Sequence, residues 1–212
     1  MVIKSQNKRG EFNLRLHEVQ ALWNAADNFR DRLIIKTLYY TGLRRFELCD
    51  LRAGDIDFDK GILVVREGKG HKMRHVPLLN DDHRADMRLF IGNRTEGPFF
   101  PTRLQSKMGV KSVNHLVGKA AKNAGLKHPN SAQGVINPHL LRHTIARHLK
   151  SQGFTAEWIA KFLGHDSVKT TMDTYGTLSI DEMQLMAHRK LGTPLPRHLQ
   201  KDIDVQEMRR LE

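Results

Sequence analysis

The stretch Asn137–Gly176 reads NPHLLRHTIARHLKSQGFTAEWIAKFLGHDSVKTTMDTYG and holds most of the reactive side chains that stand out in this chain. Pro138 predicts the start of a helix, because proline is favoured in the first turn, where a missing N–H costs nothing. His139 and Arg142 follow three residues apart, a spacing that places them on one face of that helix. Three further side chains of interest follow in the same stretch: His143, His165 and Tyr175.

These side-chain types suit chemistry at a phosphodiester. An arginine can hold the non-bridging oxygens, a histidine can bond to them or move a proton, and a tyrosine hydroxyl can attack phosphorus. The ordinary alternatives are a solvated helix face for His139 and Arg142 and a packing role for Tyr175. His139 and His143 also have the spacing of some zinc sites, but the metalloprotease pattern requires a glutamate where Leu140 stands, so we expect no metal site.

The charge of the chain points to a polyanionic partner. Its 212 residues include 35 Lys and Arg against 23 Asp and Glu, a formal net charge of +12. Such an excess attracts DNA and RNA first, and the alternatives are added solubility or a ribosomal type of protein. Cys49 is the single cysteine, which excludes an internal disulfide and a cysteine-rich zinc site and fits a cytoplasmic setting. No apolar run reaches the ~20 residues of a membrane span.

The first part of the chain has helical periodicity. One helix is predicted over 15–28, with Asn13 as its cap, and a more apolar one over 29–41, which Gly42 ends. Arg44 follows that glycine at a turn, where a side chain can point into a cleft. Further helices are predicted over 80–92, 112–125, 155–163 and 179–191.

A hairpin interrupts the helices. The runs 61–66 and 73–78 are rich in residues that favour strands, and Gly68-Lys69-Gly70 lies between them, which predicts two antiparallel strands with a mobile lysine at the tip. Lys69 by itself is an ordinary solubilising turn residue, and the longer phosphate-binding pattern is absent. The sequence therefore predicts a mostly helical α+β fold with a small antiparallel β-sheet.

Five motifs occur in one order along the chain. They are Thr41-Gly42-Leu43-Arg44-x-x-Glu47-Leu48, Gly68-Lys69-Gly70 before Val76-Pro77-Leu78, His139-x-x-Arg142-His143, Leu163-Gly164-His165, and Thr170-Thr171 ahead of Tyr175. In this order they resemble the catalytic domain of the tyrosine recombinase (phage integrase) family, over roughly residues 13 to 190. The resemblance implies the DNA breaking-rejoining fold. It also implies an active site made of Arg44, Lys69, His139, Arg142, His165 and the nucleophile Tyr175.

The resemblance further implies site-specific cleavage and rejoining of DNA through a covalent 3′-phosphotyrosine, as in integration, excision or resolution. No metal or other cofactor is implied, and the implied assembly is a homo-tetramer on paired sites of double-stranded DNA. In such a site the arginines stabilise negative charge, His139 accepts the tyrosine proton and Lys69 protonates the leaving 5′ oxygen. One alternative is a catalytically idle DNA-binding regulator that uses helices within 155–174. Another is a metal-dependent nuclease, for which we find no acidic cluster or ligand spacing.

The domain expectation has three parts: a basic lead-in over 1–12, the catalytic domain over 13–191, and a C-terminal tail over 192–212. Pro194 and Pro196 separate the tail from the domain, and its apolar residues could dock on a neighbouring protomer. Most members of the family carry an additional helical core-binding domain before this point. The chain is therefore expected to be either an isolated catalytic domain or a short member of the family that lacks the core-binding domain.

Overall fold

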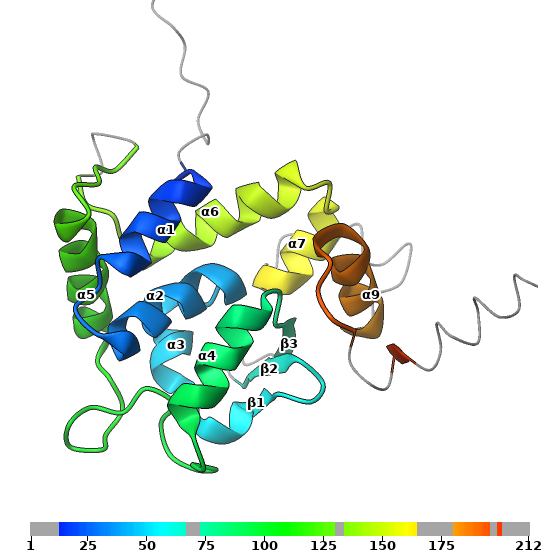
Figure 1. The fold of residues 1–212 in the computed structure, drawn as a ribbon, viewed down its shortest axis with the longest axis horizontal. Helices are drawn as coiled ribbons and strands as arrows, with labels where there is room; N and C mark the ends of the chain where they lie inside the picture. Colours follow the sequence, from blue (N-terminus) through cyan, green and yellow to red (C-terminus); the bar gives the residue numbers. More distant parts are fainter. Residues whose placement is uncertain (1–12, 67–72, 130–133, 165–179, 196–198, 201–212) are drawn as a thin grey trace, which may run out of the picture.

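Helices make up most of the fold and one small antiparallel sheet lies beside them, which confirms the predicted mostly helical α+β class (Figure 1). The computed structural model describes residues 13–66, 73–129, 134–164, 180–195 and 199–200. In chain order the elements are α1 (Leu16–Asn24), α2 (Phe29–Thr41), α3 (Arg45–Asp50), the 3-10 turn η1 (Ala53–Asp55), β1 (Ile56–Asp57), β2 (Ile62–Val65), β3 (Arg74–Pro77), α4 (Asp81–Ile91), α5 (Val110–Asn123), α6 (Pro138–Ser151), α7 (Ala156–Leu163) and α9 (Ile180–Leu191).

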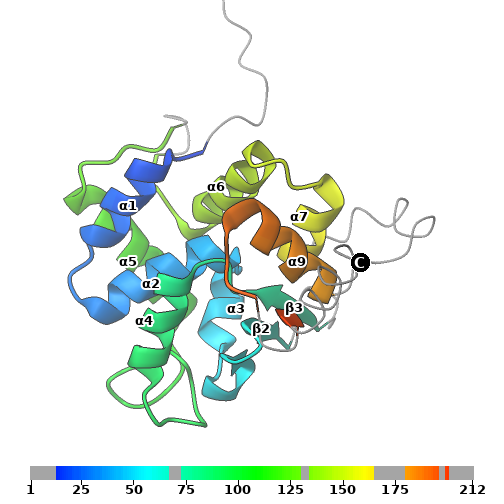
Figure 2. The ribbon, with the colours of Figure 1, turned by 45° about the vertical axis from the view of Figure 1, so that its right-hand side comes forward.

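Helix α2 is central, with α1, α4 and α6 packed around it (Figures 1 and 2). Its side chains Leu33, Ile34 and Leu38 are fully buried, as its apolar sequence predicts. Gly42 ends the helix with a left-handed φ of 60°, a conformation that glycine adopts without a steric cost. A Cβ at this position would lie 2.5 Å from Leu163 Cδ2. Helix α7 can therefore approach the end of α2 only because residue 42 is glycine.

The first helix is shorter than its periodicity predicts. The helix expected over 15–28 ends at Asn24, because the side chain of Asn28 accepts the backbone N–H three residues on and caps α2 instead. Asn13 is not the cap of α1. Arg15 takes that position, and its N–H donates at 2.6 Å to the glutamate of the first turn.

The sheet has three antiparallel strands in the order β1-β2-β3. Strands β2 and β3 form the predicted hairpin, with Leu63 opposite Val76 and Val65 opposite Arg74. The short strand β1 is an addition that the sequence did not indicate, and it pairs with β2 through Ile56 and Leu63. Helices α7 and α9 pack on β3 (Figure 2), so the hairpin lies against the helices that follow α6.

Hydrogen bonds fix the middle of α6 to the start of the described chain. The hydroxyl of Thr144 accepts from the Leu14 N–H at 3.1 Å. His148 Nε2 lies 3.0 Å from the Leu14 carbonyl oxygen, and its Nδ1 lies 2.7 Å from the Tyr39 hydroxyl. Nε2 therefore donates to the carbonyl, and Nδ1 accepts from the tyrosine. These bonds hold α2 and α6 in a fixed relation to each other.

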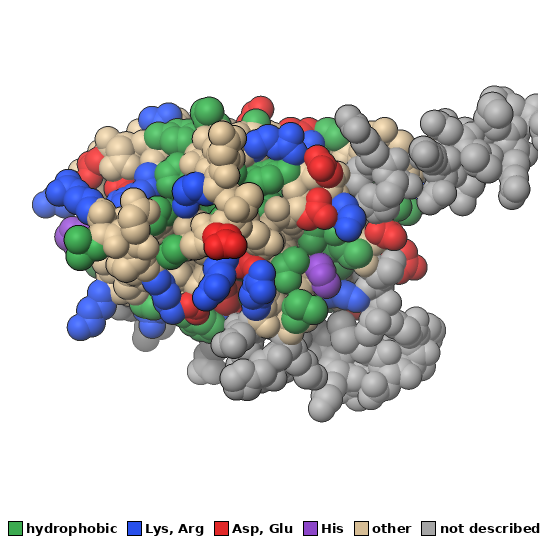
Figure 3. Space-filling view, turned by 90° about the horizontal axis from the view of Figure 1, so that it is seen from below, with side chains coloured by type: hydrophobic (Ala, Val, Ile, Leu, Met, Phe, Trp, Pro, Cys, Tyr) green, Lys and Arg blue, Asp and Glu red, His purple; other side chains and the backbone are tan. Residues whose placement is uncertain are grey.

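The surface carries charges of both signs. On the face drawn in Figure 3, basic and acidic side chains are interspersed with apolar ones rather than separated by sign. Some charged pairs join different elements, as Arg88 of α4 does with Asp59 after β1, at 3.4 Å. Within the described ranges, no helix is both long and apolar enough to cross a membrane.

Candidate active site

The start of α6 forms as the sequence predicts. The side-chain oxygen of Asn137 caps the helix by accepting from the N–H groups of His139 and Leu140, at 3.0 and 3.2 Å. Pro138 occupies the first turn. The apolar face is buried through Leu140, Leu141, Ile145 and Leu149. This arrangement leaves His139 exposed at the helix start, while Arg142, one turn later, is buried.

Arg142 is a buried cation held by two backbone carbonyls, with 5% of its surface exposed. Its Nη1 donates to the Gly42 oxygen at 2.5 Å and its Nη2 to the Leu163 oxygen at 2.6 Å. Carbonyls at helix ends lack intrahelical donors, so these bonds satisfy groups that need partners. Burial, and then the positive charge of Arg44, lower the pKa of Arg142 to about 9, and the side chain stays charged at neutral pH. Because both direct partners are neutral, its charge can still attract an anion.

Arg44 approaches the same turn from the N-terminus of α3. It follows the turn made by Gly42, and 22% of its side chain is exposed. Its Nη1 donates to Glu47 Oε1 at 3.0 Å, and its Nη2 donates to the Gly164 oxygen at 3.1 Å. Two guanidinium groups, one from α3 and one from α6, are thus fixed beside the turn that ends α7.

A pocket of about 470 Å³ brings together three of the six predicted site residues, Arg44, His139 and Arg142. Its other lining residues are Leu43, Arg45, Phe46, Asn114, Asn137 and Pro138. The remaining three predicted residues, Lys69, His165 and Tyr175, lie outside the described residues. In the sequence, Lys69 belongs to the connection between β2 and β3, and the other two belong to the segment between α7 and α9.

His139 and His143 face each other one turn apart on α6. Their Nε2 atoms lie 2.8 Å apart, and their rings meet edge to face with centroids 4.3 Å apart. Such a contact needs one N–H and one bare nitrogen. Burial, then His143 and then Arg142, lower the pKa of His139 below its ordinary value, so this imidazole is neutral at pH 7 and can accept a proton. Among the described residues, no three His, Cys, Asp or Glu side chains are arranged to hold a metal ion.

Glu47 belongs to this site although the sequence motif gave it no role. Its buried carboxylate accepts from Arg44 N–H at 2.7 Å and from both terminal nitrogens of Arg74, at 2.7 and 2.8 Å. Burial raises its pKa, but the hydrogen bonds and charge of Arg74, with the bonds of Arg44, lower it below its usual value overall. The carboxylate is therefore charged and fully engaged. Its position in the first turn after Arg44 is the sequence signal for this capping role.

Asn114 of α5 lines the pocket and is a second site residue that sequence reasoning missed. Its Oδ1 is buried and has no hydrogen-bond partner within the described ranges. No motif marks this residue, because α5 reaches the pocket only in the folded chain. The helix itself begins at Val110, before the predicted start at residue 112.

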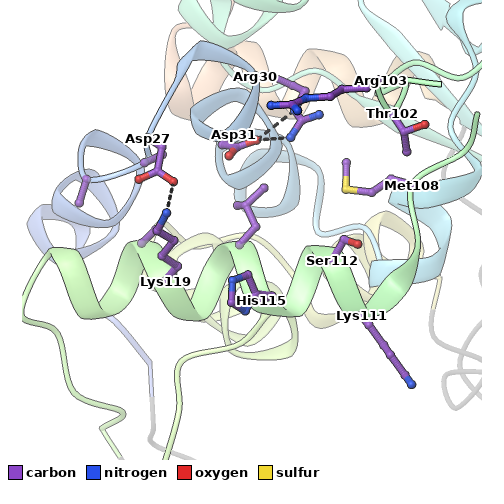
Figure 4. Close-up of a pocket in the computed structure, with 14 residues that line it drawn as sticks. Asp27, Arg30, Asp31, Thr102, Arg103, Met108, Lys111, Ser112, His115 and Lys119 are labelled. Atoms are coloured by element: carbon purple, nitrogen blue, oxygen red, sulfur yellow. Dashed lines mark hydrogen bonds and ion pairs between the residues drawn. The ribbon is translucent and has the colours of Figure 1, made fainter. Parts of the chain in front are cut away.

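A second pocket, of about 590 Å³, lies between the start of α2, the loop over 102–108 and α5 (Figure 4). Its charged lining residues are Asp27, Arg30, Asp31, Arg103, Lys111 and Lys119, together with His115. Two pairs form here: Lys119 with Asp27 at 2.7 Å and Arg30 with Asp31 at 2.9 Å. Lys111 extends away from both pairs in Figure 4, at a helix start that has no acidic residue in its first turn. Helix α5 thus lies between the two pockets.

Known proteins match this chain in sequence. The sequence profile of the Phage integrase family matches residues 13–180. Tyrosine recombinase XerA of Pyrococcus furiosus is 37% identical over 150 residues, which cover 68% of this chain and 49% of that protein. Tyrosine recombinase XerC of Corynebacterium glutamicum is 37% identical over 160 residues, which cover 73% and 49%. The chain spans about half the length of these curated relatives.

Solved structures share the fold. A crystal structure of XerA recombinase matches with a TM-score of 0.65 and 28% identity, covering 84% of this chain and 64% of that one. The catalytic core of lambda integrase matches with a TM-score of 0.59 and 20% identity, covering 73% of this chain and 91% of that one, a likeness that concerns the fold alone. Because the sequence profile, the relatives and the fold agree, this chain belongs to the phage integrase family of tyrosine recombinases.

Proposed function

We propose that this chain supplies the catalytic domain of a site-specific DNA recombinase, which cleaves and rejoins strands through a covalent 3′-phosphotyrosine. The observation that carries the proposal is the pocket in which two fixed guanidinium groups, of Arg44 and Arg142, meet the neutral imidazole of His139. Membership of the phage integrase family supports it, as do relatives named tyrosine recombinases.

The two arginines would stabilise the charge that develops during cleavage. Attack on a phosphodiester places extra negative charge on the non-bridging oxygens, and cations already held in position stabilise that charge without reorganising. Arg142 is held by two carbonyls and Arg44 by Glu47 and the Gly164 carbonyl. Both side chains are therefore placed before substrate binds.

The remaining steps are assigned from the family resemblance. The Tyr175 oxygen forms a bond to phosphorus while the bond from phosphorus to the 5′ oxygen breaks. The phenol proton passes to His139, Lys69 gives a proton to the departing 5′ oxygen, and His165 bonds to a non-bridging oxygen. The phosphotyrosine keeps the phosphate in an ester, so a 5′ hydroxyl of another strand can reverse the step and exchange the strands.

Double-stranded DNA is the proposed partner. The net charge of +12 favours a polyanion, and solved structures of lambda integrase and XerH, which share this fold, are complexes with DNA. Both pockets flank α5, and Lys111 stands exposed at its start. We therefore propose that the duplex lies across this end of α5, in a DNA-associated, cytoplasmic setting.

Strand exchange involves two duplexes, so we propose that four protomers act together. The domain limits remain those expected from the sequence: a lead-in over 1–12, a catalytic domain over 13–191 and a tail over 192–212. Gly192 supports the second boundary, because its φ is 66° and its N–H donates at 2.8 Å to the His188 oxygen, which ends α9. Truncation after Leu191 should leave folding intact, by circular dichroism, and reduce assembly on paired sites.

A nicked suicide duplex tests the function. Incubation with it should give a covalent protein–DNA band that Tyr175→Phe abolishes without weakening duplex binding, whereas the matched control Tyr40→Phe retains the band. An adduct mapped to Tyr39 or Tyr40 would contradict the assigned nucleophile. Binding without any adduct would favour the idle regulator, and cleavage that EDTA abolishes would favour a metal-dependent nuclease.

A further inference from the structure

Arg74, the first residue of β3, lies at the border of the candidate active site, and no sequence motif marks it. Its side chain is 10% exposed, a high degree of burial for an arginine. It contacts two parts of the site, the carboxylate of Glu47 and the Gly164 turn at the end of α7. It also follows the connection that carries Lys69 and pairs with Val65 across the hairpin.

Arg74 and Glu47 form a fork of two hydrogen bonds. Arg74 Nη1 donates to Oε1 at 2.7 Å, and Nη2 donates to Oε2 at 2.8 Å. Two parallel bonds fix the plane of a carboxylate as well as its position. Arg44 Nη1 donates to the same Oε1 at 3.0 Å. The orientation of the Arg44 guanidinium therefore depends on the fork between Arg74 and Glu47.

Arg74 also fills the space beside Gly164. A Cβ on residue 164 would lie 2.8 Å from Arg74 Cδ and 3.1 Å from its Nε. The carbonyl of this same Gly164 accepts from Arg44 Nη2 at 3.1 Å. The Nε of Arg74 is buried and has no hydrogen-bond partner in the part of the chain that the structure describes. Both arginines thus contact the turn that precedes His165 in the sequence.

An ion pair that only attached the hairpin to its neighbours would not need these contacts. Arg66, at the other side of the hairpin connection, offers the comparison. It pairs with the buried carboxylate of Asp55, yet 61% of its side chain is exposed. Its described hydrogen bonds do not reach Arg44 or Gly164, so burial and linkage to the site distinguish Arg74 from Arg66.

We propose that Arg74 is a positioning residue for strand cleavage: through Glu47 it orients Arg44, and through its packing on Gly164 it fixes the end of α7. It does not touch the phosphate. The inference rests on the proposed function, which assigns Arg44 to the scissile phosphate. A catalytic group displaced by about 1 Å can slow a reaction by roughly 10²-fold, so a positioning role has a measurable consequence.

The first test measures the rate of covalent adduct formation at saturating nicked duplex. Arg74→Met should slow adduct formation by roughly 30- to 100-fold and leave the DNA concentration that gives half the maximal rate nearly unchanged. Arg74→Lys keeps the charge but loses the fork, and should remain about 10-fold slow. The matched control Arg66→Met removes a largely exposed side chain whose described bonds do not reach the site, so its rate should stay within about threefold of wild type. Circular dichroism checks folding, and Arg74→Lys carries the test if Arg74→Met does not fold.

A neutral substrate separates positioning from folding. A methylphosphonate at the scissile position has a methyl group in place of one non-bridging oxygen and so lacks the negative charge that Arg44 would neutralise. If Arg74 acts through Arg44, the Arg74 variants should form the adduct at rates within about threefold of wild type on one diastereomer of this substrate. On that diastereomer the interaction between Arg44 and the phosphate charge, which the variants weaken, no longer contributes to the rate. For the same reason, Arg74→Met added to Arg44→Ala should slow charged-substrate cleavage no further.

Four outcomes overturn the inference. Wild-type rates in Arg74→Met and Arg74→Lys contradict the positioning role and leave the proposed function standing. Equal deficits on the charged and neutral substrates, or additive losses with Arg44→Ala, assign a purely structural role to Arg74. A wild-type chain that binds the duplex and forms no adduct contradicts the proposed function first, and the inference fails with it.

Discussion

In the pocket of Arg44 and Arg142, Arg142 is buried and bound to fixed acceptors, whereas beside α5 in Figure 4 Lys119 and Asp27 are largely exposed and bound to each other. Arg142 is 5% exposed and donates to two carbonyls. Lys119 and Asp27, by contrast, form a pair in which the side chains are 52% and 44% exposed. Burying a cation has a desolvation cost that exposed pairs avoid, so groups of the first kind are candidates for function.

This difference predicts that the two regions affect different measurable quantities. A buried cation keeps a strong field, because little water screens it, and suits the stabilisation of charge in a chemical step. Exposed charges are screened by salt and attract a polyanion over a longer range. Substitutions in the first pocket should therefore change the cleavage rate or folding, and substitutions in the second should change DNA affinity.

The largest effect is expected from Arg142→Met. Removing a fixed donor to developing charge costs roughly 10²- to 10³-fold in rate, and loss of a whole cation should reach at least the upper figure in adduct formation. Arg142→Lys keeps a charge but cannot reach both carbonyls as a rigid fork, so it should recover only part of the rate. Arg88→Met, at an arginine with 60% exposure, is the control and should change little. A loss below about tenfold for Arg142→Met would contradict its role in charge stabilisation.

Glu47→Gln should destabilise the fold. It leaves the guanidinium groups of Arg44 and Arg74 without their buried countercharge, which costs about 3–5 kcal/mol of unfolding free energy when one partner of a buried pair is removed. For a chain of this size that corresponds to a thermal midpoint about 10 °C lower. Asp27→Asn, which breaks the exposed pair with Lys119, should leave the midpoint within error of wild type.

The stabilisation by Glu47 should also depend on pH in a defined direction. Because the folded-state pKa of Glu47 is lowered, its stabilisation is present above the unfolded-state pKa and is lost as pH falls through the folded-state pKa. The difference in midpoint between wild type and Glu47→Gln should therefore narrow in acid. A constant difference across pH would mean that the carboxylate charge does not carry the effect.

Local sequence patterns predicted those site residues whose positions are set by a single segment of the chain. Pro138 and its cap set the start of α6, so His139 and Arg142 could be placed from spacing alone. The fork between Glu47 and Arg74 could not be predicted in this way. It joins residues 27 positions apart and exists only when the hairpin folds back on α3. Asn114 was missed for the same reason. The short strand β1 was missed because two residues are too few to show the alternating pattern of a strand.

A smaller effect is expected from His143→Gln. If His139 accepts the tyrosine proton, as proposed, cleavage requires its neutral form, and the rate should fall as pH drops through the pKa of that histidine. Besides burial, the neighbouring His143 lowers this pKa, and its removal should raise the pKa toward the ordinary value of about 6.5. The acid limb of the rate profile should then move to higher pH, whereas the exposed control His17→Gln should leave it in place. A limb that does not move would show that His143 does not set the proton affinity of His139.

The smallest effect is expected on α5, where Lys111 in the first turn and Lys119 in the second half of the helix offer a matched pair. Lys111 is exposed in the first turn, whereas the Lys119 ammonium already lies 2.7 Å from Asp27. If the duplex lies across this helix start, Lys111→Ala should weaken binding about two- to fivefold and reduce the slope of log K against log salt by about one, because one phosphate contact is lost. Lys119→Ala should change the slope less, since Asp27 already neutralises its charge.

Cleavage at saturating DNA should be unchanged in both variants, because neither lysine lies in the pocket of Arg142. Equal slopes for wild type and Lys111→Ala would mean that the DNA backbone passes elsewhere, and that the charges of Figure 4 serve only the packing of α1, α2 and α5.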